Sequence, residues 1–434
     1  MNLTEAYLLL VVLLAVVAVA SILFRYQIGL ITPVVFVAGL ITALIAGMGF
    51  RLREVTEGPF VFVDSIMWVL CGAAFAYLLY TNGTFQYLFE KVISKKRGPA
   101  AQMFLLVLFI ALPGMITGTA LASVATTGLM AGRYLLDKGV EKSKVVEVVA
   151  VSALFGMLLP PLCLPGMAFA VARNGSYPGA FEGYFLPLLI VTVPALIVYS
   201  ALSGRRILGD VEAESNVQKT GSPICLIPLI VVAVLVLGYN FLYFAIPYYG
   251  GYPVIYLIGF VLALIFKVKG ANPLTSAADG IHTVALEMAM VLAYASVIEV
   301  FNLVGVNGTI AAQLEIAGAN AVVVTLLLAA LVLVGGTLLG APFAYAVGGI
   351  ATYLSCIVNS GNHEMVMLGL GVILALSMFL SVRGGLTELT AKQLEVTDVT
   401  GPQVAKRNVI PVLVVLVIAV VYLVTGGTLK FLMI

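Results

Sequence analysis

The sequence predicts an all-α polytopic membrane protein, and three observations support this class. Hydrophobic residues make up 62% of the 434 residues and charged residues only 10%, whereas soluble domains average about 25% charged residues. Apolar runs of about 20 residues, long enough to cross the hydrocarbon core of a bilayer, recur along the chain. Several runs are interrupted by glycine, proline and hydroxylated residues, which lipid tolerates only where protein or trapped water shields the backbone. The interruptions therefore predict re-entrant helical hairpins and broken helices around a protected cavity.

Composition and residue spacing argue against several functions. A net charge of +2 gives no basic surface for nucleic acid, and the two histidines, His282 and His363, lie too far apart for a histidine-built metal centre. The four cysteines have no ligand spacing and are expected to be small core residues. No nucleophile with a base is recognisable, so we do not expect an enzyme. The start of the chain carries no basic residue before its apolar run, so the first helix is expected to be retained.

The first half of the chain is expected to begin with three membrane spans and an interfacial helix. Segment Thr84–Ser94 is amphipathic and is followed by Lys95-Lys96-Arg97, a pattern typical of a helix that lies along the membrane surface. A span over about 183–203 ends this half, and the hydrophilic loop 203–222 follows it. The three initial spans are expected at about residues 6–24, 28–49 and 60–80.

Residues 99–136, between these spans, are expected to form a re-entrant helical hairpin. Phe104–Leu112 reads as a short first arm that Pro113-Gly114 ends, because proline cannot continue a regular helix. The Thr117-Gly118-Thr119 turn can cap a returning arm. Such a tip gathers free carbonyls from one helix end and free amides from another, which are the groups that hold a cation and an anion within a membrane.

The apolar segment 144–173 is expected to break within the membrane. Pro160 and Pro161 each lack an amide and clash with the preceding turn, so the helix cannot continue regularly through Leu159–Gly166.

The second half of the chain repeats this plan. A second hairpin is expected over about 317–357, interrupted by Gly335–Pro342, and Pro342 suits the first turn of its returning arm. A second broken helix over about 364–396 fails at Ser381–Gly385. The spans before the hairpin are expected at about 224–247, 252–266 and 280–300, with an interfacial piece at 310–316.

The two halves are expected to form an inverted repeat. An odd number of membrane crossings separates the span at 28–49 from its counterpart at 252–266, because a hairpin contributes none, and this turns the second half upside down. Lysine and arginine then concentrate on one side, which makes that side cytoplasmic and places both termini outside the cell inner membrane. The predicted units are residues 1–27 (N-terminal helix), 28–203 (first repeat), 204–251 (cytoplasmic linker and connecting helix) and 252–434 (second repeat).

The hairpin tips and helix breaks are expected to form a transport site near the middle of the bilayer. Carbonyls at the ends of Phe104–Leu112 and Val145–Leu158, with serine and threonine hydroxyls, offer the oxygen cage that a small hard cation such as sodium prefers. The amides at Gly118-Thr119 and Gly340-Ala341 carry partial positive charge and can receive a carboxylate. The two ions would partly neutralise each other, which predicts cation-coupled transport of an organic anion.

Several of these residues also have a structural interpretation that involves no ligand. Hydroxyls near the first tip also suit small-residue helix packing with bonds to helix carbonyls. Arg383 either binds the anion or extends to the membrane interface. Acids at membrane depth either relay protons or lie at the interface against polar neighbours. The hydroxyl residues are Ser123, Thr126 and Thr127, and the acids are Asp64, Glu287 and Glu299.

Three motifs of the first half resemble a known family. The run Gly114–Gly128, the segment Leu136-Asp137-Lys138-Gly139 and the stretch Ala150–Pro161 are similar to the large membrane (permease) subunit of tripartite ATP-independent periplasmic (TRAP) transporters, DctM-like, within the ion transporter superfamily. The resemblance implies an elevator-type fold and sodium-driven uptake of organic acids such as dicarboxylates or sialic acid. It also implies two partners, a small four-helix subunit and an extracytoplasmic substrate-binding protein.

The resemblance also assigns candidate site residues by position. The sequence departs from the family at two places, because Thr117-Gly118-Thr119 stands where serine-rich sequence is usual and Val382–Gly385 stands where paired prolines are expected. The implied substrate-binding residues are Thr117, Gly118, Thr119, Pro160, Pro161, Gly340, Ala341, Pro342 and Arg383. The implied sodium ligands are Thr119, Ser123, Gly156, Gly336, Thr337, Ser381 and Gly384.

The sequence as a whole predicts sodium-coupled uptake of small organic anions, carboxylates above all, by alternating access of the elevator type. No cofactor is expected apart from the coupling ion Na⁺. The alternative is a stand-alone carrier of the same superfamily, coupled to a cation or to protons and independent of a binding protein. A channel is disfavoured because a fixed pore does not require two opposed hairpins.

Overall fold

The computed structural model is almost entirely helical, and no strand occurs in the residues that it describes. Seven of the described helices are long and apolar enough to cross a bilayer, or eight when one sharply bent helix pair is counted as a span. These findings confirm the predicted all-α, multi-pass class. The structure describes the whole chain apart from residues 1–2, 25–27, 95–96, 175–183, 210–220, 242–250, 359–363, 383, 397–398, 427 and 433–434.

The chain begins with two apolar helices, a short amphipathic helix, a longer span and an interfacial piece. The predicted span at 60–80 starts only at Val63, because a separate helix precedes it over Leu52–Phe60. The predicted amphipathic helix at 84–94 is confirmed, and its aromatic face is buried against protein. The helices are α1 (Leu3–Leu23), α2 (Ile28–Ile45), α3 (Leu52–Phe60), α4 (Val63–Thr81) and α5 (Thr84–Ile93).

The first predicted hairpin folds as a helix, a tight turn and a returning helix, which we call the first helix pair. The predicted stop at Pro113-Gly114 is wrong, since the helix continues through both residues to Thr117. The proline is tolerated because the amide of Gly114 bonds to Ser123 Oγ (2.9 Å), and the helix ends where Gly118 adopts a left-handed φ of 73°. The first helix pair consists of α6 (Pro99–Thr117) and, returning, α7 (Ala120–Ser123), the π-helical turn η1 (Val124–Gly128) and α8 (Leu129–Asp137).

The predicted break at the paired prolines is confirmed. Helix α9 (Lys142–Leu158) ends with Leu159 in an extended conformation, and α10 begins only at Leu164. The Pro160-Pro161 peptide bond is cis. The predicted span at 183–203 corresponds to α11 (Phe185–Leu208), while most of the predicted loop 203–222 lies outside the described residues. Helix α10 covers Leu164–Asn174.

The second half contains a long central helix, a second helix pair and a second break. Helix α14 runs for 32 residues, Pro273–Val304, and so exceeds the predicted span at 280–300. We call α16 and α17 the second helix pair, and they meet at Gly340. The predicted interruption of the helix after Leu380 is confirmed, because α18 ends there and α19 begins only at Leu386. The remaining elements are η3 (Pro223–Leu226), α12 (Ile227–Phe241), α13 (Gly251–Ile265), α15 (Val306–Ile316), α16 (Ala321–Leu339), α17 (Ala341–Val358), α18 (Glu364–Leu380), α19 (Leu386–Gln393), α20 (Gly401–Arg407), α21 (Val409–Thr425) and η4 (Lys430–Leu432).

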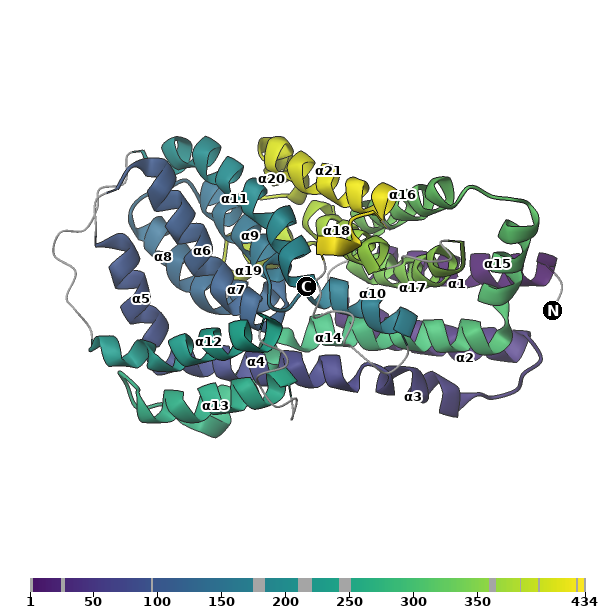
Figure 1. Cartoon of the computed structure of the whole chain (residues 1–434), viewed down its shortest axis with the longest axis horizontal. Helices are drawn as coiled ribbons and strands as arrows, with labels where there is room; N and C mark the ends of the chain where they lie inside the picture. The colour runs from purple at the N-terminus through teal and green to yellow at the C-terminus, as the bar shows by residue number, and fades with distance from the viewer. Residues whose placement is uncertain are drawn as a thin grey trace.

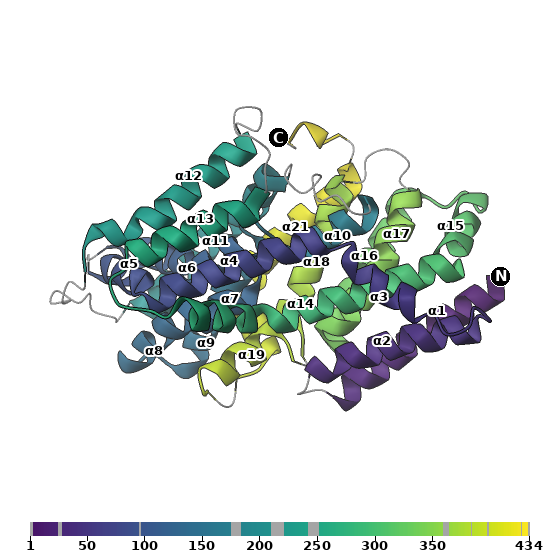
Figure 2. The same ribbon diagram turned by 90° about the horizontal axis from the view of Figure 1, so that it is seen from below.

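Helices α4 and α14 lie side by side, α4 beside the first helix pair and α14 running from there toward the second (Figure 1). The first helix pair lies at one end of the molecule and the second pair at the other, and the same order is visible from below (Figure 2). At 1.5 Å per residue, α14 is about 48 Å long. It contacts α7 of the first helix pair and α17 of the second.

The two helices that lead into the breaks form the centre of the protein. Every residue of α9 from Val145 to Leu158 and every residue of α18 from Met365 to Phe379 is buried. Large apolar side chains are exposed instead on peripheral helices such as α1, α12 and α13, as expected for surfaces that face lipid.

Candidate functional site

The tip of the first helix pair is tied to the broken helix next to it. The Gly118 carbonyl accepts a hydrogen bond from the Leu164 amide at 2.9 Å, and the Thr117 and Thr119 hydroxyls bond to each other at 2.8 Å. A Cβ on Gly118 would lie only 2.9 Å from the Leu164 nitrogen. Both threonines are completely buried. The tip is therefore held in one defined shape against the start of α10.

Below the tip, α6 and α9 cross at close range through glycine. A Cβ on Gly156 would lie 2.7 Å from the Ala111 carbonyl oxygen and 2.9 Å from Ser123 Oγ. That hydroxyl accepts from the Gly114 amide and contacts the Ala111 carbonyl (3.4 Å). Ser123 and Gly156 therefore lie in the helix crossing, where the hydroxyl bonds to backbone of the first helix pair.

The second helix pair has matching contacts. Gly340 has a φ of 99° at the tip, and the Thr337 carbonyl accepts a hydrogen bond from the Val382 amide at 2.9 Å. Gly336 lies against Ser377 of α18 and Ala344 of α17, so that a Cβ there would be 2.7 Å from the Ala344 Cβ. At each tip, a carbonyl thus accepts a hydrogen bond from a backbone amide at the neighbouring helix break.

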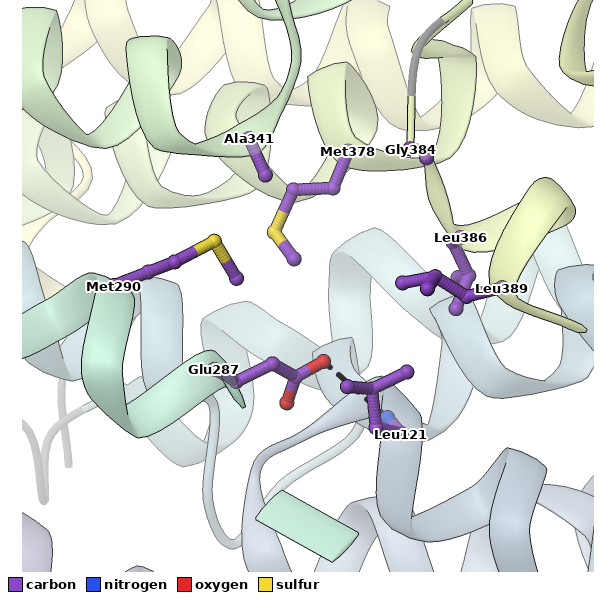
Figure 3. A pocket seen from close by; sticks show the side chains of 9 residues that line it. Leu121, Glu287, Met290, Ala341, Met378, Gly384, Leu386 and Leu389 are labelled. Atoms are coloured by element: carbon purple, nitrogen blue, oxygen red, sulfur yellow. Dashed lines mark hydrogen bonds between the residues drawn. The ribbon is translucent and has the colours of Figure 1, made fainter. Parts of the chain in front are cut away.

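A small, partly open cavity lies where the two helix pairs, the second break and α14 meet. Its volume is about 10 Å³, which is room for about one water molecule. Figure 3 shows Glu287 pointing into this region from α14, with Met290 beside it and Met378 opposite. The first tip contributes Leu121, the second tip Ala341, and the second break Gly384 and Leu386.

Glu287 is the acidic residue of this cavity. Its side chain is 1% exposed, and Oε1 accepts hydrogen bonds from the amides of Ala120 and Leu121, each at 3.2 Å. Oε2 is buried and has no hydrogen-bond partner. A carboxylate of the chain itself therefore occupies amides next to those predicted to receive a substrate carboxylate.

All amides of the first tip have partners within the chain. Gly118 donates to the Gly114 carbonyl (2.6 Å) and Thr119 to the Thr117 hydroxyl (3.2 Å). For the Ala341 amide at the second tip, no hydrogen bond is found among the described residues. The amides of the first tip are therefore already occupied, in contrast to the Ala341 amide within the described residues.

The predicted site residues fall into three groups. Ala341 and Gly384 line the cavity. A second group forms the two tips, the two helix breaks or the helix crossings next to the tips, without lining the cavity. Arg383 lies outside the described residues. The tip and break residues are Thr117, Gly118, Thr119, Pro160, Pro161, Thr337, Gly340, Pro342 and Ser381, and the crossing residues are Ser123, Gly156 and Gly336.

The other candidate acids differ from Glu287 in their surroundings. Asp64 is exposed in the first turn of α4 and Glu299 is half-buried on α14. His282 is exposed on α14. No group of three metal-binding side chains occurs in the part of the chain that was described. The sequence does not separate Glu287 from the other two acids, because Glu299 lies in an equally apolar stretch of the same helix.

A multi-pass helical protein in which two helix-pair tips and a helix break meet at an internal site has the architecture of a membrane transporter. A protein-family model described as "Tripartite ATP-independent periplasmic transporter, DctM component" matches residues 81–382, which is more than half of the chain. The chain belongs to the DctM family, the large component of TRAP-type secondary transporters, and the suspected resemblance is confirmed. Its role is therefore transport rather than catalysis.

Two solved structures share the fold. The YdaH transporter of Alcanivorax borkumensis is 14% identical, with a TM-score of 0.61 and coverage of 86% of each chain. MtrF of Neisseria gonorrhoeae, described as illuminating a class of antimetabolite efflux pumps, is 14% identical, with a TM-score of 0.53 and coverage of 89% of this chain and 84% of that one. At this identity the likeness concerns the fold alone. A search of curated proteins gave no match.

Proposed function

We propose that this protein is the membrane subunit of a TRAP-type transporter that takes up small organic anions, carboxylates above all, by coupling to sodium. The observation that carries the proposal is that both tips and the second break line one cavity with α14. Backbone ends that meet away from lipid can bind ions without a permanent buried charge. Family membership supports the same function.

The two halves act, in this proposal, as an inverted repeat that moves against a fixed frame. The same number of residues separates Gly114 from Gly336 as separates Gly118 from Gly340. Gly114 and Gly336 each lie at a helix crossing, and Gly118 and Gly340 each lie at a tip. The proposed moving body contains both helix pairs with α9, α10, α18 and α19. The frame contains α4 and α14, which pack along each other. Movement of one body past the other would expose the site alternately to each side.

The ions would bind at different ends of this site. Thr119 and the carbonyls near the first tip supply oxygens for sodium, since hard cations prefer oxygen ligands. The Ala341 amide and the start of α17 supply partial positive charge for the substrate carboxylate. Arg383, next to the cavity residue Gly384 in sequence, would add a full positive charge for the same anion.

The expected partners are a small four-helix subunit and an extracytoplasmic substrate-binding protein, in a complex of the inner membrane with both termini of this chain outside the cytoplasm. The stand-alone carrier remains the rival proposal. Uptake by proteoliposomes that contain this chain alone distinguishes the two, because a tripartite system requires the added subunit and binding protein. Full uptake without them would favour the stand-alone carrier.

The affinity for sodium is expected to fall in Thr119→Val. The change removes the tip hydroxyl while keeping the side-chain shape, and it should raise the sodium concentration for half-maximal thermal stabilisation roughly tenfold, the loss of about 1.4 kcal/mol of binding energy. Thr126→Val is the matched control, because this buried hydroxyl bonds only to the Ala122 carbonyl (2.6 Å) within its own helix. The measurement is thermal unfolding in detergent, in sodium or choline chloride, with a panel of organic acids. Equal sodium responses of wild type and Thr119→Val would remove the hydroxyl from the cation site, and no response to sodium or any acid in the wild type would refute the proposed coupling.

A further inference from the structure

One oxygen of the Glu287 carboxylate is buried without a partner. Oε1 accepts the two amides of the first tip, but Oε2 makes no hydrogen bond at the edge of the cavity in Figure 3. A negative charge at membrane depth is costly unless it is paired or fully hydrogen-bonded. A cation bound at Oε2 would therefore offset the cost of burying this carboxylate.

The lining of the cavity favours a proton as that cation. Apart from Glu287, all the side chains that line it are apolar, among them Leu121, Met290, Met378 and Leu389. A metal ion such as sodium needs several oxygen ligands, and a proton needs only the carboxylate itself. The volume of about 10 Å³ admits one water molecule to deliver the proton.

The neighbouring elements bring no compensating charge within the described part of the chain. Tyr345 of α17 lies close enough to Glu287 to interact with it electrostatically, and its ring packs edge-on against Tyr294 of α14. The side chain of Thr119, which belongs to the first tip, interacts with the Glu287 carboxylate. Tyrosine is neutral over the physiological range, so Glu287 is the group of this cluster that can change charge there.

We propose that Glu287 is a proton-binding site whose occupancy controls the contact between α14 and the tip of the first helix pair. When the carboxylate is ionised, its charge strengthens the hydrogen bonds from Ala120 and Leu121. When Oε2 takes a proton from water, the charge is lost and the contact weakens. A falling pH therefore favours separation of the tip from α14, and the proton returns to water when the contact forms again. In the transporter proposed above, on which this step rests, the proton is a second coupling ion beside sodium.

The test measures protonation directly, without a substrate. Infrared difference spectra of the full chain in lipid nanodiscs between pH 8 and pH 5 report the carbonyl band of a protonated acid. We expect a band that grows as the pH falls, is absent in Glu287→Gln and is retained in Asp64→Asn. A band unchanged in Glu287→Gln, or no band at any pH, would overturn the proposal. Loss of the band when sodium replaces choline would also overturn it, by assigning the site to sodium.

A second measurement follows the tip itself. Leu121→Cys is introduced into a variant without native cysteines, and the rate at which a maleimide labels it is measured. This labelling rate is divided by the rate for Leu274→Cys, whose position is 80% exposed, to correct for the effect of pH on the reagent. We expect the ratio to rise several-fold from pH 8 to 5, and to be high and independent of pH when Glu287→Gln is added. The same pH dependence with and without Glu287 would contradict the proposal. Because no substrate is present, a failure to observe organic-anion uptake would not change this result. In the same way, a negative labelling result would not contradict organic-anion uptake.

Discussion

Replacement of Gly156 by alanine is expected to lower the stability of the protein by roughly 1–3 kcal/mol, the usual cost of overpacking a core. The added Cβ would lie 2.7 Å from the Ala111 carbonyl oxygen and 3.1 Å from the Ala111 Cα. Backbone of α6 cannot withdraw without disturbing the tip that it supports. The midpoint of thermal unfolding in detergent should fall accordingly.

Gly308→Ala is the matched control for this substitution. Gly308 also lies within a helix, α15, but a Cβ there would meet nothing within 4 Å. Alanine should therefore raise stability by up to about 1 kcal/mol through helix propensity alone. Stability of Gly156→Ala equal to or above that of the wild type would show that α6 and α9 do not cross as closely as described.

Arg206→Met is expected to destabilise the protein by about 3 kcal/mol. Glu147 of α9 is completely buried and forms an ion pair with Arg206 from the end of α11. Removal of the guanidinium leaves the Glu147 carboxylate buried, with Arg407 at 3.9 Å as its remaining charged neighbour. A buried charge that has lost its partner is among the most destabilising defects in a protein. The change in thermal unfolding midpoint and in the yield of folded protein would measure this cost.

Two comparisons make that prediction specific. Glu147→Gln should cost less than Arg206→Met, because the Arg206 side chain is 36% exposed and can reach water when its partner is lost. Arg53→Met, which breaks a surface pair with 82% and 46% exposure, should change stability by less than about 1 kcal/mol. An Arg206→Met protein as stable as Arg53→Met would contradict the account of Glu147.

The sequence was sufficient for features that depend on local chemistry. The break after Leu158 follows from the missing amides of Pro160 and Pro161, and α5 follows from its amphipathic pattern. The end of α6 was misplaced because a hydroxyl nine residues away, Ser123 Oγ, supports the backbone next to Pro113. That partner reaches α6 only after the chain turns back, so no local rule could include it.

The site was only partly predictable for the same reason. Glycine patterns located both tips, but the contact that occupies the first tip comes from Glu287, which lies more than 160 residues further along the chain. A lone acid in an apolar helix identifies a functional position without its partner. Only the packing of α14 against α7 shows which of the three acids meets the tip.

Cross-linking across the cavity tests the central claim most directly, namely that the helix pairs move past α14 during transport. A reversible bifunctional thiol reagent would join Leu121→Cys to Met290→Cys, across the two proposed bodies, or Leu121→Cys to Met378→Cys, within the moving body; all three positions line the same cavity. We expect the first cross-link to abolish uptake of an organic acid into proteoliposomes, with recovery on cleavage. The second cross-link adds the same bulk to the cavity but joins parts of one body, so it should lower uptake less than the first. Undiminished uptake by protein fully cross-linked between Leu121→Cys and Met290→Cys would contradict the claim.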